Sequence, residues 1–126
     1  MKTISVGWFE IPVSNMDRAI LFYNAIFQIK IGKQTFDGTE MGWFPFDGNG
    51  KGAAGSLIKN NKHYKPSSSD GILVYFSCSN VNDELSRIEK AGGKTVQLKT
   101  QISENHGYMA TFLDSEGNRI ALHSLK

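Results

Sequence analysis

Residues 12–27 read PVSNMDRAILFYNAIF, a strand end at a proline followed directly by an amphipathic helix. Ser14 is placed to cap the helix, and Asp17 follows three residues later in an approximate capping box. Apolar side chains then recur at helical spacing on one face. They are Met16, Ala19, Ile20, Tyr23, Ile26 and Phe27. Because such a face must be buried, the stretch predicts a helix packed on a β-sheet.

The residues around this helix predict the strands of that sheet. Residues 3–11 are rich in β-branched and aromatic residues and stop at Pro12, which predicts a first strand. Three short extended runs follow the helix, and DGNG at 47–50 is a hairpin signal between two of them. The runs are KIGKQTF (30–36), EMGWFPF (40–46) and AGSLIK (54–59). The first half of the chain therefore has the predicted order β-α-β-β-β.

The second half repeats this order. GILVYFSC at 71–78 predicts a strand, SNVNDELSRIEKAGG at 79–93 predicts a helix capped by Ser79, and three further strand candidates follow. VSNMDRAI and CSNVNDEL share a local pattern 65 residues apart, which indicates two copies of one module. We therefore expect an α+β fold in one domain over 1–126: module one at about 1–60, a linker at about 60–70, and module two at about 71–126.

Composition narrows the class of protein. The net charge is +2, and the 14 basic and 12 acidic residues are scattered without a Lys/Arg block, so no nucleic-acid or membrane partner is expected. No window approaches a membrane span or a signal peptide. The single cysteine, Cys78, lies in an apolar run, which predicts a buried, inert thiol and suits the reducing cytoplasm.

Two motifs carry a resemblance to a known family. PVSNMDRAILFYNAIF and DSEGNRIAL (114–122) are similar to the patterns PVxDxxRAxxFY and DPDGNxIEL of the vicinal oxygen chelate superfamily. That superfamily includes glyoxalase I, bleomycin and fosfomycin resistance proteins and extradiol dioxygenases. The resemblance covers nearly the whole chain. It implies two βαβββ modules whose curved mixed sheets enclose a cleft for a small ligand, commonly within a homodimer, and it leaves open whether modules pair within or between chains.

The resemblance also implies where a divalent metal would be held in metal-dependent members, by His, Gln and Glu side chains on inward strand positions. Those positions fall here on Trp8, Leu73, Ala121 and the run 51–61, which supply no carboxylate or imidazole. We therefore expect no metal and no other cofactor. A displaced metal site stays open as the less favoured alternative. Its donors would be Glu10 and His123, with His106 or Glu104 as additional donors.

Several side chains are candidates for the cleft. The expected ligand-binding residues are Trp8, Trp43, Tyr75, Glu104 and Tyr108, and the candidate catalytic residues are Glu10, His106 and His123. The aromatic rings would supply contact area for a flat or amphipathic molecule. Each of these residues also has an ordinary structural explanation. Aromatic rings often pack in the core, and polar groups at strand ends often form hydrogen bonds or ion pairs with nearby residues.

Three functions follow from these residues. The first is small-molecule binding without the standard metal, of the bleomycin-resistance type. The alternative is a lyase or isomerase of the glyoxalase class that uses displaced metal ligands or organic acid/base groups such as Glu10, Glu104 and His106. The third is a structural or regulatory homodimer with a filled cleft. The sequence leaves open the ligand and whether the chain is an enzyme, with lactoylglutathione-lyase-like chemistry if it is.

Overall fold

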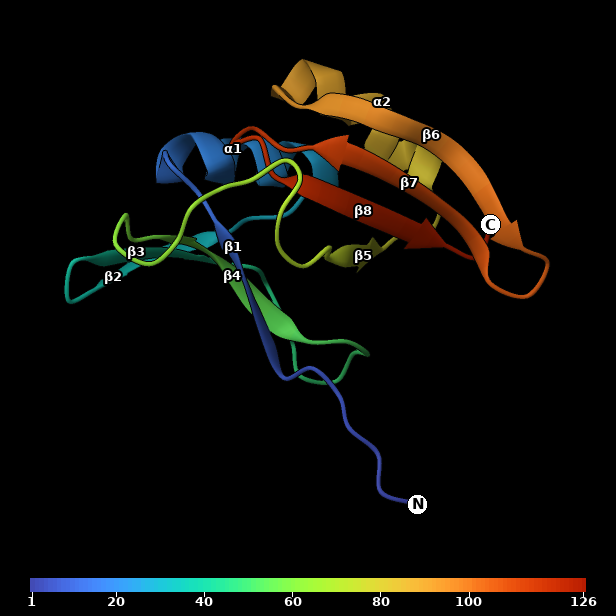
Figure 1. Ribbon diagram of the computed structural model, residues 1–126, viewed down its shortest axis with the longest axis horizontal. Coiled ribbons are helices and arrows are strands. Elements are labelled where there is room, and N and C mark those ends of the chain that lie inside the picture. Colours follow the sequence, from blue (N-terminus) through green and yellow to red (C-terminus); the bar gives the residue numbers. More distant parts are fainter.

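A computed structural model describes residues 1–126 and shows two βαβββ units, one after the other (Figure 1). The first unit contains β1 (Trp8–Pro12), α1 (Met16–Phe27), β2 (Gly32–Phe36), β3 (Thr39–Trp43) and β4 (Ala54–Lys59). The second contains β5 (Tyr75–Ser77), α2 (Val81–Ala91), β6 (Lys94–Ser103), β7 (Gly107–Leu113) and β8 (Arg119–Ser124). The predicted α+β class and module order are confirmed.

Each unit forms one mixed four-stranded sheet, and the two sheets have the same topology. The strand orders are β1-β4-β3-β2 and β5-β8-β7-β6. In each sheet the first strand runs parallel to the last strand of its unit and lies at the sheet edge. In Figure 1 the first sheet lies below α1, β6 of the second sheet crosses in front of α2, and the residues before β1 extend away from both sheets. The outer edges of β1 and β5 are therefore free of strand partners within the chain.

The core lies between the helices and the helix-facing sides of both sheets. Four residues of the predicted helix face, Met16, Ala19, Tyr23 and Ile26, are buried, whereas Ile20 and Phe27 are only partly buried. Phe22, which the periodicity did not place on that face, is fully buried, with its ring centroid 6.0 Å from that of Phe112 in β7. The helix packs against the second unit as well as its own sheet, so its buried face is wider than one sheet requires.

The structure corrects both predicted helix caps by one residue. Asn15, rather than Ser14, caps α1 by accepting a hydrogen bond from Arg18 N at 3.0 Å. Asn80, rather than Ser79, caps α2 and accepts from Asn82 N. Both asparagines have extended backbone angles, which the capping position requires. The Ser-Asn pair offers two capping side chains in succession, and only the backbone decides between them.

Four strand predictions were too long, including the run 30–36, in which the strand begins only at Gly32. The first strand begins at Trp8 rather than residue 3, and the run 71–78 pairs only over Tyr75–Ser77. The run 40–46 ends at Trp43, shortly before Pro45, which cannot donate to a ladder. DGNG lies within the loop 44–53 that joins β3 to the antiparallel β4, so the predicted hairpin is present, with a connection longer than a two-residue turn. In each case the residues beyond the observed strand have strand-forming composition, but no neighbouring strand is available to pair with them.

The turn between β7 and β8 fastens the second unit to α1. Asp114 is 4% exposed and accepts a hydrogen bond of 2.6 Å from the Tyr23 hydroxyl. Glu116 accepts from the backbone N–H groups of Ser14 and Asn15 at 2.9 and 2.7 Å, and its other oxygen lies 2.7 Å from Arg18 Nε. The two sequence motifs therefore contact each other directly. Glu116 of DSEGNRIAL accepts hydrogen bonds from backbone N–H groups at the start of α1, which have no acceptor within the helix.

These contacts set the ionisation of both carboxylates. Burial raises the pKa of Asp114, although the hydrogen bonds from Tyr23 and Asn118 partly oppose the rise. Burial alone would also raise the pKa of Glu116, but the hydrogen bonds from Arg18 and the two backbone N–H groups lower it overall. The ionised Glu116 carboxylate is more favourable in the folded state than in the unfolded chain. Glu116 therefore stabilises the fold fully at pH values above its ordinary pKa, and this stabilisation is lost as the pH falls through the lowered pKa of the folded state.

We predict that Glu116→Gln lowers the free energy of unfolding at pH 7 by about 1.5–3 kcal/mol, because charged hydrogen bonds are lost. The difference from wild type should shrink as the pH falls below the ordinary glutamate value of 4.5. Urea unfolding of both proteins between pH 7 and pH 3 measures this. Glu104→Gln, in an exposed turn, is the control for loss of a carboxylate. A deficit that stays constant over this pH range would contradict the prediction.

Candidate functional site

A cavity of about 1260 Å³ lies between β1 and β5. Its lining includes all of β1 and the whole segment 70–79 around β5. Of the 32 lining residues 17 are hydrophobic, so the surface is apolar with polar groups interspersed. Cavities that bind small molecules typically measure about 300–1,000 Å³ and have this mixture. The cavity is large enough for a drug-sized molecule.

Four phenylalanines from different parts of the chain contribute clustered rings to the apolar surface of this cavity. Phe9, Phe27, Phe44 and Phe76 all line it, and all four belong to one aromatic cluster with Tyr23. Ring centroids lie 4.8 Å apart for Phe27 and Phe76 and 5.4 Å apart for Phe44 and Phe76. Tryptophan and tyrosine were the aromatic residues expected here, and the phenylalanines were not, because each phenylalanine by itself resembles an ordinary core residue.

A carboxylate lies at the β1 side of the cavity among aromatic rings. Glu10 Oε1 accepts a hydrogen bond of 2.6 Å from the Tyr64 hydroxyl, and Trp8 Nε1 lies 3.4 Å from Oε2. The Trp8 ring in turn meets Trp43 edge-on, with centroids 5.3 Å apart. The hydrogen bond to Glu10 is the largest cause of a raised pKa at Tyr64. Tyr64 lies in the predicted linker, where polar composition gave no signal of a contact with β1.

Strand register explains why these residues meet. Glu10 in β1 is opposite Ser56 in β4, which is opposite Trp43 in β3. Side chains opposite one another share a sheet face, and Trp8 joins them two residues before Glu10. Ser56 is fully buried and its Oγ has no hydrogen-bond partner. Trp8, Glu10 and Trp43, three of the sequence candidates, are therefore brought together, and Tyr75 lines the cavity from the β5 side.

The other four candidates lie elsewhere, around the hairpin between β6 and β7. His123 Nε2 is 2.6 Å from the carbonyl oxygen of His106, and His106 Nδ1 is 2.7 Å from Ser103 Oγ. On the second sheet, the Lys99 ammonium group lies over the Tyr108 ring, with Nζ 4.5 Å from the ring centroid. Glu104 is exposed in the hairpin turn. None of these four residues lines the cavity, so they are separated from Glu10.

The positions at which the resemblance implies metal ligands do not fit a divalent ion. Trp8, Leu73 and Ala121 carry an indole or alkyl group, and β4 presents only the Ser56 hydroxyl on the same face. No group of three or more His, Cys, Asp and Glu side chains lies close enough to hold a metal ion. Zinc and similar ions require several imidazole, thiolate or carboxylate donors at fixed geometry. We derive no metal chemistry for these residues.

Cys78 and Glu84 line the cavity near the start of α2. Burial, followed by the charge of Glu84, raises the pKa of the Cys78 thiol to about 12. Glu84 Oε1 is buried without a hydrogen-bond partner, and Oε2 lies 3.5 Å from Arg87. A thiol with a raised pKa is a poor nucleophile.

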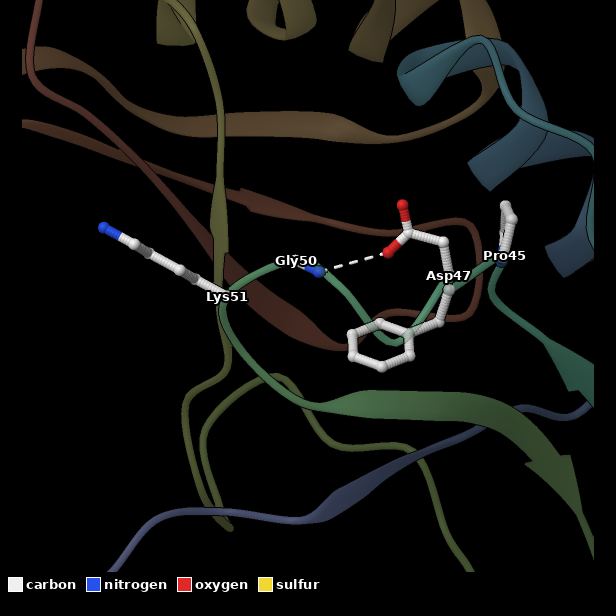
Figure 2. A pocket seen from close by; sticks show the side chains of 5 residues that line it. Pro45, Asp47, Gly50 and Lys51 are labelled. Atoms are coloured by element: carbon white, nitrogen blue, oxygen red, sulfur yellow. Dashed lines mark hydrogen bonds between the residues drawn. The ribbon is translucent and has the colours of Figure 1, made fainter.

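A second, smaller hollow of about 520 Å³ lies on the loop between β3 and β4 (Figure 2). Asp47 Oδ1 accepts hydrogen bonds from the backbone N–H groups of Asn49 and Gly50, at 2.9 and 3.1 Å. Figure 2 shows the Lys51 side chain pointing away from Asp47. The carboxylate is occupied in closing the turn, so this hollow has no set of converging polar groups.

Comparison with known proteins agrees with this geometry. Residues 5–122 match the model of the Glyoxalase/Bleomycin resistance protein/Dioxygenase superfamily. A search of curated proteins finds no match to the sequence. Neither α1 nor α2 has the length and apolar composition that a membrane-spanning helix requires.

Solved structures share the fold at low sequence identity. A glyoxalase I mutant from Zea mays superposes with a TM-score of 0.74 at 16% identity, over 94% of this chain and 45% of the maize chain. This chain therefore spans about half the length of the maize protein. A glyoxylase/bleomycin resistance protein/dioxygenase domain from Frankia sp. EAN1pec gives 0.72 at 17% identity over 98% of both chains. A glyoxalase family protein from Bacillus cereus gives 0.73 at 16% identity, over 98% of this chain and 95% of that one.

We predict that Cys78 reacts with a thiol reagent on the order of a thousandfold more slowly in the native state than in urea at pH 8, because its thiolate fraction is lower. The native rate should still be rising at pH 10, since the pKa is about 12. Absorbance of the released thiolate of Ellman's reagent measures both rates. Glu84→Gln removes a neighbouring negative charge and should speed the native reaction. A native rate that levels off near pH 9 would contradict this prediction.

Proposed function

The chain belongs to the glyoxalase/bleomycin resistance protein/dioxygenase superfamily, and from that membership we propose that it binds a small amphipathic molecule in the cavity between β1 and β5. The observation that carries the proposal is the cavity itself. Its size suits a small molecule, four phenylalanine rings form an apolar surface, and Glu10 supplies a polar group at one side. Aromatic surface provides contact area, and one or two polar groups fix the orientation of a ligand.

We further propose that the ligand is held without the standard divalent metal of the family. The side chains at Trp8, Leu73 and Ala121 support this, because none is a metal ligand. Binding of the bleomycin-resistance type needs only shape, apolar contact and hydrogen bonds. Of Glu10, Glu104 and His106, the acid/base groups expected for the lyase or isomerase alternative, only Glu10 lines the cavity. Nothing in the geometry favours that alternative.

A homodimer is the third part of the proposal. β6 is the outer strand of the second sheet, and it exposes three large apolar side chains, Val96, Leu98 and Ile102. An exposed apolar edge strand attracts another chain unless something covers it. A second copy of this chain is the occupant that the family resemblance favours.

We predict that native protein has twice the chain mass of 14.0 kDa by sedimentation equilibrium. Leu98→Glu should shift the mass toward the monomer, because it places a charge on the exposed apolar edge. Leu21→Glu is a matched control, since Leu21 on α1 is 71% exposed and Leu98 is 72% exposed. A wild-type monomer, or equal effects of the two substitutions, would contradict the proposed interface.

The cavity is tested with a glycine substitution. A Cβ at Gly55 would overlap the Phe9 ring, so Gly55→Ala should drive that ring toward the cavity and reduce its volume. Gly32→Ala is the control, because a Cβ there meets nothing within 4 Å. Ligand-observed NMR with a library of neutral amphipathic fragments provides the measurement. We expect hits on wild type that bind about tenfold more weakly to Gly55→Ala, with Gly32→Ala unchanged.

Two outcomes would overturn the proposed function. The first is that no fragment binds the wild-type protein. The second is that the hits bind Gly55→Ala as well as they bind wild type, which would place them outside the cavity. Circular dichroism of both variants confirms that they are folded before binding is compared.

A further inference from the structure

We propose that the ligand is an organic cation, whose ammonium group binds at the corner formed by Trp8, Glu10 and Trp43. This inference rests on the proposed function, because Trp8 and Glu10 line the same cavity, whereas Trp43 lies outside the lining and contacts Trp8. It adds the chemical class of the ligand and the residues that select it.

The first argument is the charge of Glu10. The structure contains five ion pairs, and none of them includes Glu10. Its two hydrogen-bond donors, the Tyr64 hydroxyl and Trp8 Nε1, are neutral groups. Glu10 is partly shielded from water and lies among aromatic rings. A carboxylate in such surroundings attracts a cation more strongly than one in open water, because the local dielectric is lower. No lysine or arginine forms an ion pair with Glu10, although Lys51, Lys65 and Arg119 line other parts of the same cavity.

The second argument is the state of the tryptophan rings. Trp8 is 39% exposed and Trp43 is 40% exposed, although they contact each other edge-on. Tryptophan is the side chain whose ring face binds cations best. The one cation–π contact in the structure joins Lys99 and Tyr108, on the other sheet. Both tryptophans therefore keep ring surface to which no cation of this chain is bound.

The third argument is that these groups are fixed on one face of one sheet. Register places Glu10, Ser56 and Trp43 in a row across β1, β4 and β3. The Tyr64 hydroxyl holds the Glu10 carboxylate from the loop after β4. The Ser56 Oγ in the middle of this row is buried and has no hydrogen-bond partner. Aromatic rings around a negative group are the arrangement by which proteins bind quaternary ammonium groups.

The preference for a cation must arise locally, because the whole chain has a net charge of +2. Long-range attraction would favour anions, so the total charge does not explain binding of a cation. Contacts at short range are screened less by salt than distant surface charges. Binding through this corner should therefore persist at moderate ionic strength.

The experiment compares choline with 3,3-dimethylbutan-1-ol, which has the same shape without the charge. The chain has two tryptophans, and both belong to this corner, so tryptophan fluorescence reports on it alone. Titrations at constant ionic strength, with sodium chloride replacing choline chloride in the reference, give both affinities. We expect choline to bind at least about tenfold more tightly than the alcohol. Equal affinities, or no fluorescence response to choline, would overturn the proposal, and this comparison needs no variant.

Substitutions then assign the effect to Glu10. Glu10→Gln keeps the shape and removes the charge, and we expect it to abolish the preference for choline over the alcohol. Glu40→Gln removes the same charge from β3 of the same sheet, where Glu40 pairs with Lys33 and Lys59, and should leave the preference unchanged. An undiminished preference in Glu10→Gln, or its loss in Glu40→Gln, would overturn the assignment.

The result is separable from the proposed function. If neutral fragments bind the wild-type cavity and lose affinity in Gly55→Ala while choline does not bind, the ammonium proposal is wrong and the cavity function stands. If neither choline nor any fragment binds, both are wrong.

Discussion

The contact between the β7–β8 turn and the start of α1 fixes the relation between the two units of the fold. Asp114 and Glu116 lie about a hundred residues from their partners Tyr23, Ser14 and Asn15. Carboxylates are costly to bury unless they are paired, so these contacts hold only in one mutual position of turn and helix. Because β1 leads directly into α1 and the turn leads into β8, beside β5, this position determines how far apart the edges of β1 and β5 lie. The cavity is the space that remains.

Much of this arrangement could be predicted from local patterns. The periodicity of residues 16–27 gave the helix, and the repeated Ser-Asn pattern gave the second unit. Errors appeared where a choice depends on the tertiary partner. Asn15 rather than Ser14 caps α1: the backbone N–H groups of both residues donate to Glu116, and it is the Asn15 side chain that accepts from Arg18 N. Strand lengths at the first strand and at 71–78 depended in the same way on how far a neighbouring strand extends.

The candidate site shows the same division between local and distant information. Strand alternation correctly places Trp8 and Glu10 on one face of β1, but it does not say that Tyr64 reaches Glu10 from a polar loop 54 residues later. Alternation also gives no distance between strands of different sheets. This is why His123 and Glu10 could both be expected to contribute to one displaced metal site. His123 instead contacts the His106 carbonyl, away from the cavity lining. A residue's face follows from its own neighbours in sequence, whereas its partners follow from the packing of the two units.

The identity of residue 8 bears on which cations this face is suited to hold. A divalent metal gives up a strongly bound hydration shell, and only several imidazole or carboxylate donors compensate for that loss. One carboxylate beside indole rings does not. An organic ammonium has a diffuse charge and a weak hydration shell, so aromatic faces together with a single carboxylate are sufficient to hold it. With tryptophan where the family resemblance implies a metal ligand, and Glu10 two residues later without a cationic partner, the face of β1 is suited to the second kind of cation rather than the first.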